Sequence, residues 1–207
     1  YRPLFSRALN NVYVANAFFS IHTYLLLYIN SPFLTKIVSE KMLGALYSVG
    51  ALANMLLMIR APHMVARLGI RKFALFVLAA DALGIVGMIT STHPLLVAGS
   101  FVLHQATVLL MVYTLDLFLE RATQNEIYTG RIRSIFLTIS NILLVASPLI
   151  AGTIVTHSQS FVPVYFASLM FVIPLFFIIS LDLPKNGIGS KHVRIWESLT
   201  KVWKTAN

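Results

Sequence analysis

The chain has 207 residues, of which 57% are hydrophobic and only 11% are charged, with a mean hydropathy of +0.80. This composition excludes an ordinary soluble domain, whose surface carries far more charge, and predicts an all-α integral membrane protein. The net charge is +9, but the cations lie between apolar spans rather than in one basic patch, so no nucleic-acid partner is expected. The absence of cysteine excludes a disulfide framework and a thiolate metal site, and we expect neither a metal nor a cofactor.

Six apolar spans are predicted, each near the ~20 residues that cross the hydrocarbon core of a bilayer. They cover about 10–30, 42–65, 72–91, 95–119, 134–156 and 160–181. With the N-terminus inside, 14 of the 16 lysines and arginines fall on one side, and only Lys36 and Lys41 fall on the other. This bias predicts that both termini are cytoplasmic. We therefore expect a multi-pass protein of the cell membrane, in a prokaryotic inner membrane.

Polar residues recur at helical spacing within the first, second, fourth and fifth spans, so each set shares one helical face. The third and sixth spans are almost wholly apolar and are predicted to be lipid-facing supports. If the four polar faces converge, they line one central cavity for a solute. The residues expected to line it are Asn16, Ser20, Tyr24, Asn54, His104, Gln105, Tyr113 and Asn141.

A short basic turn, Arg67-Leu68-Gly69-Ile70-Arg71-Lys72, separates the second and third spans. It resembles the loop between the second and third helices of the major facilitator superfamily, which has an arginine, a glycine and a closing Arg-Lys pair at these places. Ala66 stands where that family has an acidic residue. The resemblance implies the six-helix bundle that forms the N-terminal half of such a transporter.

The segment from Asp116 through Glu120 to Gly130-Arg131-Ile132-Arg133-Ser134 is similar to the stretch that follows the fourth helix in the same family. This resemblance implies that Asp116 or Glu120 pairs with Arg67 or Arg71 and closes the inner mouth. Alternatively, these charges only anchor helix ends in lipid headgroups. The residues expected in this inner-gate charge network are Arg67, Gly69, Arg71, Lys72, Asp116, Glu120, Arg131 and Arg133.

Three titratable residues in or near the spans are candidates for carrying a coupling proton: His104, Asp81 and Asp116. A histidine titrates near neutral pH, although an isolated helical histidine is often only a structural hydrogen-bonding group. An ionised Asp81 within an apolar span is costly unless it is paired. It therefore either binds a proton or cation, or is a protonated acid that is hydrogen-bonded to a neighbouring helix. His22 is similarly ambiguous, because it lies off the main polar stripe of the first span.

The resemblance implies half of a secondary active transporter that moves a small organic solute by proton-coupled alternating access. The bundle is predicted to occupy 1–183, and a cytoplasmic linker with an amphipathic interfacial helix follows at 184–207. Expected partners are membrane lipids, the solute, and either a C-terminal six-helix half or a second copy of the chain. No nucleophile elbow, phosphate loop or HExxH motif is present, so we do not expect an enzyme. The alternative is a non-transporting six-helix scaffold or interaction subunit.

Overall fold

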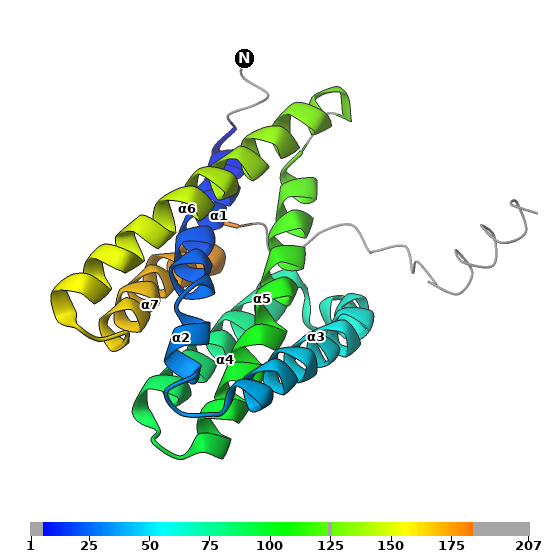
Figure 1. Cartoon of the computed structure of the whole chain (residues 1–207). Helices are drawn as coiled ribbons and strands as arrows, with labels where there is room; N and C mark the ends of the chain where they lie inside the picture. Colours follow the sequence, from blue (N-terminus) through cyan, green and yellow to red (C-terminus); the bar gives the residue numbers. More distant parts are fainter. Residues whose placement is uncertain (1–5, 124–125, 184–207) are drawn as a thin grey trace, which may run out of the picture.

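A computed structural model describes residues 6–123 and 126–183, and every regular element in these two ranges is helical (Figure 1). The predicted all-α fold is therefore confirmed for this part of the chain. The predicted amphipathic helix at 184–207 lies outside the described residues. The elements are α1 Arg7–Leu27, α2 Asn30–Leu34, α3 Glu40–Leu68, α4 Ile70–Thr90, α5 Pro94–Ala122, η2 Glu126–Tyr128, α6 Thr129–Ser158, α7 Val162–Phe177 and the π-helical turn η3 Ile178–Asp182.

Five helical segments of the described chain are long and apolar enough to cross a membrane. They are α3, α4, α5, α6 and the run Val162–Leu181, which α7 forms with the start of η3. These segments indicate a multi-pass membrane protein. The first predicted span corresponds to α1, which has 21 residues but contains Asn10, Asn11 and Asn16 and is not one of the five. A sixth crossing, by α1, stays a prediction.

Local sequence signals set several helix ends. The Ser6 hydroxyl caps α1 by accepting a hydrogen bond from the Leu9 amide at 3.3 Å, and Ser39 caps α3 in the same way through Met42 at 3.4 Å. Gly69 alone separates α3 from α4, with a φ of 78° that L side chains rarely adopt. This one-residue turn makes α3 and α4 consecutive helices of a hairpin.

The long helices form two groups with the same packing pattern. In one group α1 packs against α6 and α7, and in the other α5 packs against α3 and α4; Figure 1 shows the groups side by side. Contacts between α1 and α5 and between α4 and α7 join them. Each of these contacts is matched by another, or by itself, when α1 is exchanged with α5, α3 with α6, and α4 with α7. The two groups are therefore structural counterparts of each other, with α1 and α5 at the centre.

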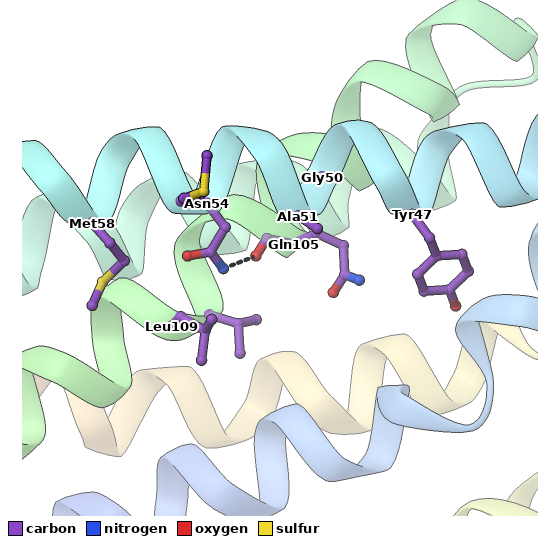
Figure 2. Close-up of a pocket in the computed structure, with 9 residues that line it drawn as sticks. Tyr47, Gly50, Ala51, Asn54, Met58, Gln105 and Leu109 are labelled. Carbon is purple, nitrogen blue, oxygen red and sulfur yellow. Dashed lines mark hydrogen bonds between the residues drawn. The ribbon is translucent and has the colours of Figure 1, made fainter.

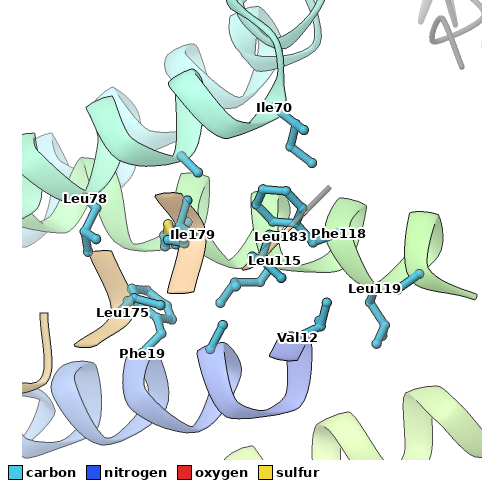
Figure 3. Close-up of a cluster of buried hydrophobic side chains, with 14 of the residues drawn as sticks. Val12, Phe19, Ile70, Leu78, Leu115, Phe118, Leu119, Leu175, Ile179 and Leu183 are labelled. Carbon is cyan, nitrogen blue, oxygen red and sulfur yellow. The ribbon is translucent and has the colours of Figure 1, made fainter. Parts of the chain in front are cut away.

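The prediction that the third span is a lipid-facing support is wrong. In its most apolar stretch, α4 has 44% of its residues buried, as does α5, whereas α3 has 17% and α6 has 22%. Figure 3 shows the reason: Leu78 of α4 meets Phe19 of α1, Leu115 of α5 and Leu175 of α7 in one apolar cluster. The uncovered helices of the bundle are α3 and α6.

A close approach between α4 and α5 depends on Gly84. A Cβ atom at this position would lie 2.9 Å from the Ser100 carbonyl oxygen and 3.0 Å from the His104 backbone nitrogen. Neither backbone atom can move without shifting α5, so we expect Gly84→Ala to destabilise the fold by roughly 1–3 kcal/mol. Thermal unfolding followed by circular dichroism measures this loss. Gly99→Ala on α5 is the matched control, because a Cβ there meets nothing within 4 Å. Equal melting temperatures for the two variants would contradict the prediction.

Candidate functional site

A cluster of titratable side chains lies inside the bundle, centred on Asp81 of α4. Asp81 is 1% exposed. Its Oδ2 atom is 2.7 Å from Nε2 of His22 on α1, and its Oδ1 atom is 2.8 Å from Nδ1 of His104 on α5. Both imidazoles are buried as well. Asp81 on α4 is thus within hydrogen-bonding distance of both His22 on α1 and His104 on α5.

Two hydroxyl groups complete this cluster. Thr107 of α5 has its Oγ1 atom 2.8 Å from Oδ1 of Asp81. Ser168 of α7 donates from Oγ to the His22 backbone carbonyl at 2.8 Å, and the same Oγ lies 2.8 Å from Nδ1 of His22. We call these five residues, His22, Asp81, His104, Thr107 and Ser168, the Asp81 cluster. It links α1, α4, α5 and α7 through polar contacts where the surrounding side chains are apolar.

The Asp81 cluster unites two of the three predicted proton-coupling candidates, Asp81 and His104, and adds His22. Asp81 is hydrogen-bonded to α1 and α5, as its second interpretation expects, while its protonation and its proton binding stay predictions. His22 was ambiguous from the sequence and was not one of the three predicted proton-coupling candidates. A signal was present, however, because a lone histidine and a lone carboxylate in separate apolar spans lower their cost by pairing. The pairing itself joins residues 59 positions apart in the sequence, and helical periodicity does not report such contacts.

A groove of about 550 Å³ lies between α3 and α5 (Figure 2). The Asn54 amide nitrogen donates to the Gln105 carbonyl at 3.0 Å, while the Asn54 Oδ1 atom is buried and has no hydrogen-bond partner in the described chain. A free buried acceptor beside apolar walls suits a neutral solute that carries a donor group. The groove is lined by Tyr47, Gly50, Ala51, Asn54, Met55, Met58, Gln105, Val108 and Leu109.

The residues predicted to line a solute cavity lie in several places. Asn54 and Gln105 line the groove, whereas His104 faces Asp81. Between α1 and α6, the Asn16 amide donates to the Phe136 carbonyl and to the Ser140 hydroxyl, each at 2.9 Å.

Ser20 also contacts α6, because its hydroxyl is 3.1 Å from that of Ser140. Asn141 is exposed on α6, and Tyr24 and Tyr113 are partly exposed. Asn16 and Ser20, which were predicted to line the solute cavity, therefore join α1 to α6 in this conformation.

The predicted inner-gate charges do not pair as expected. Asp116 forms an ion pair at 3.0 Å with Arg133 of α6, instead of with Arg67 or Arg71. Arg71 donates to the backbone carbonyls of Ser180 and Leu183, which ties the start of α4 to the end of η3. The physical reason is reach, since Arg71 is partly buried beside the unsatisfied carbonyls of a helix end. The remaining members of the predicted network, Arg67, Lys72, Glu120 and Arg131, are exposed, while Gly69 forms the turn.

Within 6–123 and 126–183, no group of three or more histidine, aspartate or glutamate residues is arranged to hold a metal ion. No protein-family model matches the chain, and a search of curated proteins found no match. Membership of the major facilitator superfamily therefore stays a prediction.

Proposed function

We propose that the chain is one half of a secondary active transporter of the major facilitator type. It moves a small organic solute by alternating access, coupled to protons, across a prokaryotic inner membrane, with both ends of the bundle on the cytoplasmic side. The observation that carries this proposal is a polar, uncovered face on α6.

Asn141 defines this face. Its side chain is exposed within one of the five apolar spans, and it makes no hydrogen bond to any residue that the structure describes. Ser134 and Thr138 are exposed at helical spacing from it and so share the face. An amide that faces hydrocarbon without a partner costs several kcal/mol. The α6 face therefore suits a wet cavity or a second protein surface better than lipid.

The repeated packing pattern supports the same proposal. If α1 crosses the membrane, the first three spanning helices along the chain, α1, α3 and α4, make an odd number of crossings. The next three, α5, α6 and α7, therefore run in the opposite direction to their counterparts in the first set. Secondary transporters are commonly built from such inverted repeats, with the substrate site near the membrane midplane. Here the exchange pairs the two central helices, α1 with α5, and the two uncovered helices, α3 with α6.

The uncovered helices also indicate where a partner binds. Large apolar side chains are more than half exposed along both of them, including Leu52 and Ile59 on α3 and Val145 and Leu149 on α6. A C-terminal six-helix half, or a second copy of this chain, supplies the opposite wall. The groove contributes amide and phenol groups and no charged residue, which suits a neutral or weakly cationic organic solute.

Water access to α6 tests this proposal. The chain has no cysteine, so Asn141→Cys introduces a single thiol, and only its thiolate form reacts with a maleimide. In membrane vesicles we expect a membrane-impermeant maleimide to label this thiol at least about ten times faster than a lipid-facing one. Phe76→Cys on α4 is the matched control, because Phe76 is 60% exposed on an apolar span.

Alternating access requires that Asn141→Cys is labelled both in right-side-out and in inside-out vesicles. A thiol at position 141 that is as unreactive as the one at position 76 would overturn the transporter proposal. That result would favour the alternative, a non-transporting scaffold whose α6 face is covered by protein or lipid.

A further inference from the structure

The hydrogen atoms of the Asp81 cluster can be assigned from the chemistry of its neighbours. Nδ1 of His22 faces the Ser168 backbone carbonyl at 3.1 Å and the Ser168 hydroxyl oxygen at 2.8 Å. That hydroxyl has one hydrogen, and we assign it to the His22 carbonyl, which lies 2.8 Å away and can only accept. Both neighbours of Nδ1 therefore act as acceptors, so Nδ1 carries a hydrogen.

The contact of the second ring nitrogen of His22 with Asp81 indicates which of these two side chains is charged. Nε2 and Oδ2 of Asp81 are 2.7 Å apart and share one hydrogen, which belongs either to an imidazolium or to a carboxylic acid. Asp81 also faces Nδ1 of His104 and the hydroxyl of Thr107, each 2.8 Å from Oδ1. A carboxylate that accepts two or three hydrogen bonds is stabilised in its charged form. His22 is then the imidazolium, and Asp81 is its counter-ion.

His104 differs from His22 at its second nitrogen. Its Nδ1 atom donates to Asp81, which leaves Nε2 as the position that gains or loses a hydrogen. The groups that face Asp81 are His22 from α1 and His104 and Thr107 from α5, while α7 contributes the uncharged Ser168. The cluster has no net charge when His104 is neutral, and a charge of +1 when His104 is protonated.

We propose that the Asp81 cluster is a one-proton site, in which His22 and Asp81 form a permanent ion pair and His104 alone binds and releases the proton. On uptake, a proton from water forms an N–H bond at Nε2 of His104; on release that bond breaks and the proton returns to water. This site is separate from the groove, and its use in coupling rests on the proposed transport function.

The position of His104 explains how a proton can influence the groove. Gln105, the next residue of α5, lines the groove and accepts the Asn54 hydrogen bond through its carbonyl. At the groove, a Cβ atom added at Gly50 of α3 would lie 3.0 Å from the Gln105 Cβ atom, so α3 and α5 are in close contact there. One turn of α5 therefore carries the proton site at His104 and, about 100° around the helix, the groove at Gln105.

Nitrogen-15 NMR of the histidine-labelled full chain in lipid nanodiscs tests the assignment. Between about pH 5 and pH 8, we expect both ring nitrogens of His22 to remain protonated, while His104 changes from one N–H group to two as the pH falls. His104→Asn and His93→Asn assign the signals, and His93 also serves as an exposed control at the start of α5.

Asp81→Asn provides a second measurement that does not depend on those assignments. Loss of the carboxylate removes the counter-ion, so one histidine signal that was fully protonated throughout should begin to titrate. A bare ring nitrogen on His22 in the wild-type chain, or a His104 ring that keeps one protonation state over the whole range, would overturn the one-proton site.

The NMR experiment tests the proton site, and thiol labelling at position 141 tests the transport proposal, so either can fail without the other. The expected NMR pattern together with an unreactive thiol at position 141 would retain the proton site and remove the transporter. A reactive thiol at position 141 with a bare nitrogen on His22 would do the reverse.

Discussion

Replacing Asp81 with alanine is expected to destabilise the chain by roughly 3–5 kcal/mol, because it leaves a buried charge without its partner. His22 has no exposed surface, and its Nε2 atom is 2.7 Å from the carboxylate that the substitution removes. His104 and Thr107 lose the acceptor they share at the same time. The measurement is the midpoint of thermal unfolding in detergent, followed by circular dichroism.

Asp116→Ala is the matched control for this prediction. Asp116 also pairs with a cationic side chain, Arg133, but the two side chains are 44% and 53% exposed. Water and salt screen such a pair, so its loss should cost only about 0–1 kcal/mol. Asp81→Asn removes the charge but keeps the size of the side chain and one acceptor oxygen, so it should retain part of the stability. Equal losses in Asp81→Ala and Asp116→Ala would show that the Asp81 cluster contains no ion pair.

The second large effect is expected from His104→Asn, which should abolish the pH dependence of the groove. The asparagine amide nitrogen can take the place of Nδ1 and still donate to Asp81, so the fold is retained while the proton-binding nitrogen is lost. A thiol introduced by Ala51→Cys at the groove reports its exposure. If proton binding and opening are coupled, the labelling rate in the wild-type background should change by roughly 5- to 150-fold between acid and alkaline pH, after correction for the thiolate fraction.

The control for this experiment is His93→Asn, which removes a histidine from the N-cap of the same helix, away from the Asp81 cluster. This background should keep the full pH dependence, whereas His104→Asn should give a flat profile. An unchanged pH profile in His104→Asn would exclude His104 as the coupling residue.

The lengths of the apolar runs located the helices, but the role predicted for one of them was wrong. The predicted span 72–91 coincides with α4, Ile70–Thr90, yet its apolar composition suggested exposure to lipid. Lipid-facing and core-facing side chains are equally apolar in a membrane protein, so hydropathy alone cannot separate them. The conspicuous Asp81 was the better guide, since a carboxylate in a span needs partners and therefore an interior position.

The pairing of charges near the inner helix ends could not be predicted from the sequence either. Sequence resemblance paired Asp116 with Arg67 or Arg71, but the structure pairs it with Arg133, 17 positions along the chain. Arg71 instead satisfies carbonyls at the end of η3. Which of several nearby cations reaches a given carboxylate depends on helix rotation and side-chain reach, and the linear spacing of charges contains neither.

The sequence by itself determined the all-helical fold of the described chain, the approximate positions of five apolar spans, and a glycine-containing break between the second and third of the six predicted spans. These features follow from local rules, because bilayer thickness fixes span length and backbone sterics fix the turn. Only the tertiary structure decided that α4 is central, that α3 and α6 are uncovered, and that His22, Asp81 and His104 meet. Those outcomes depend on how helices distant in sequence rotate and pack so that buried polar groups find partners and small residues permit close approach.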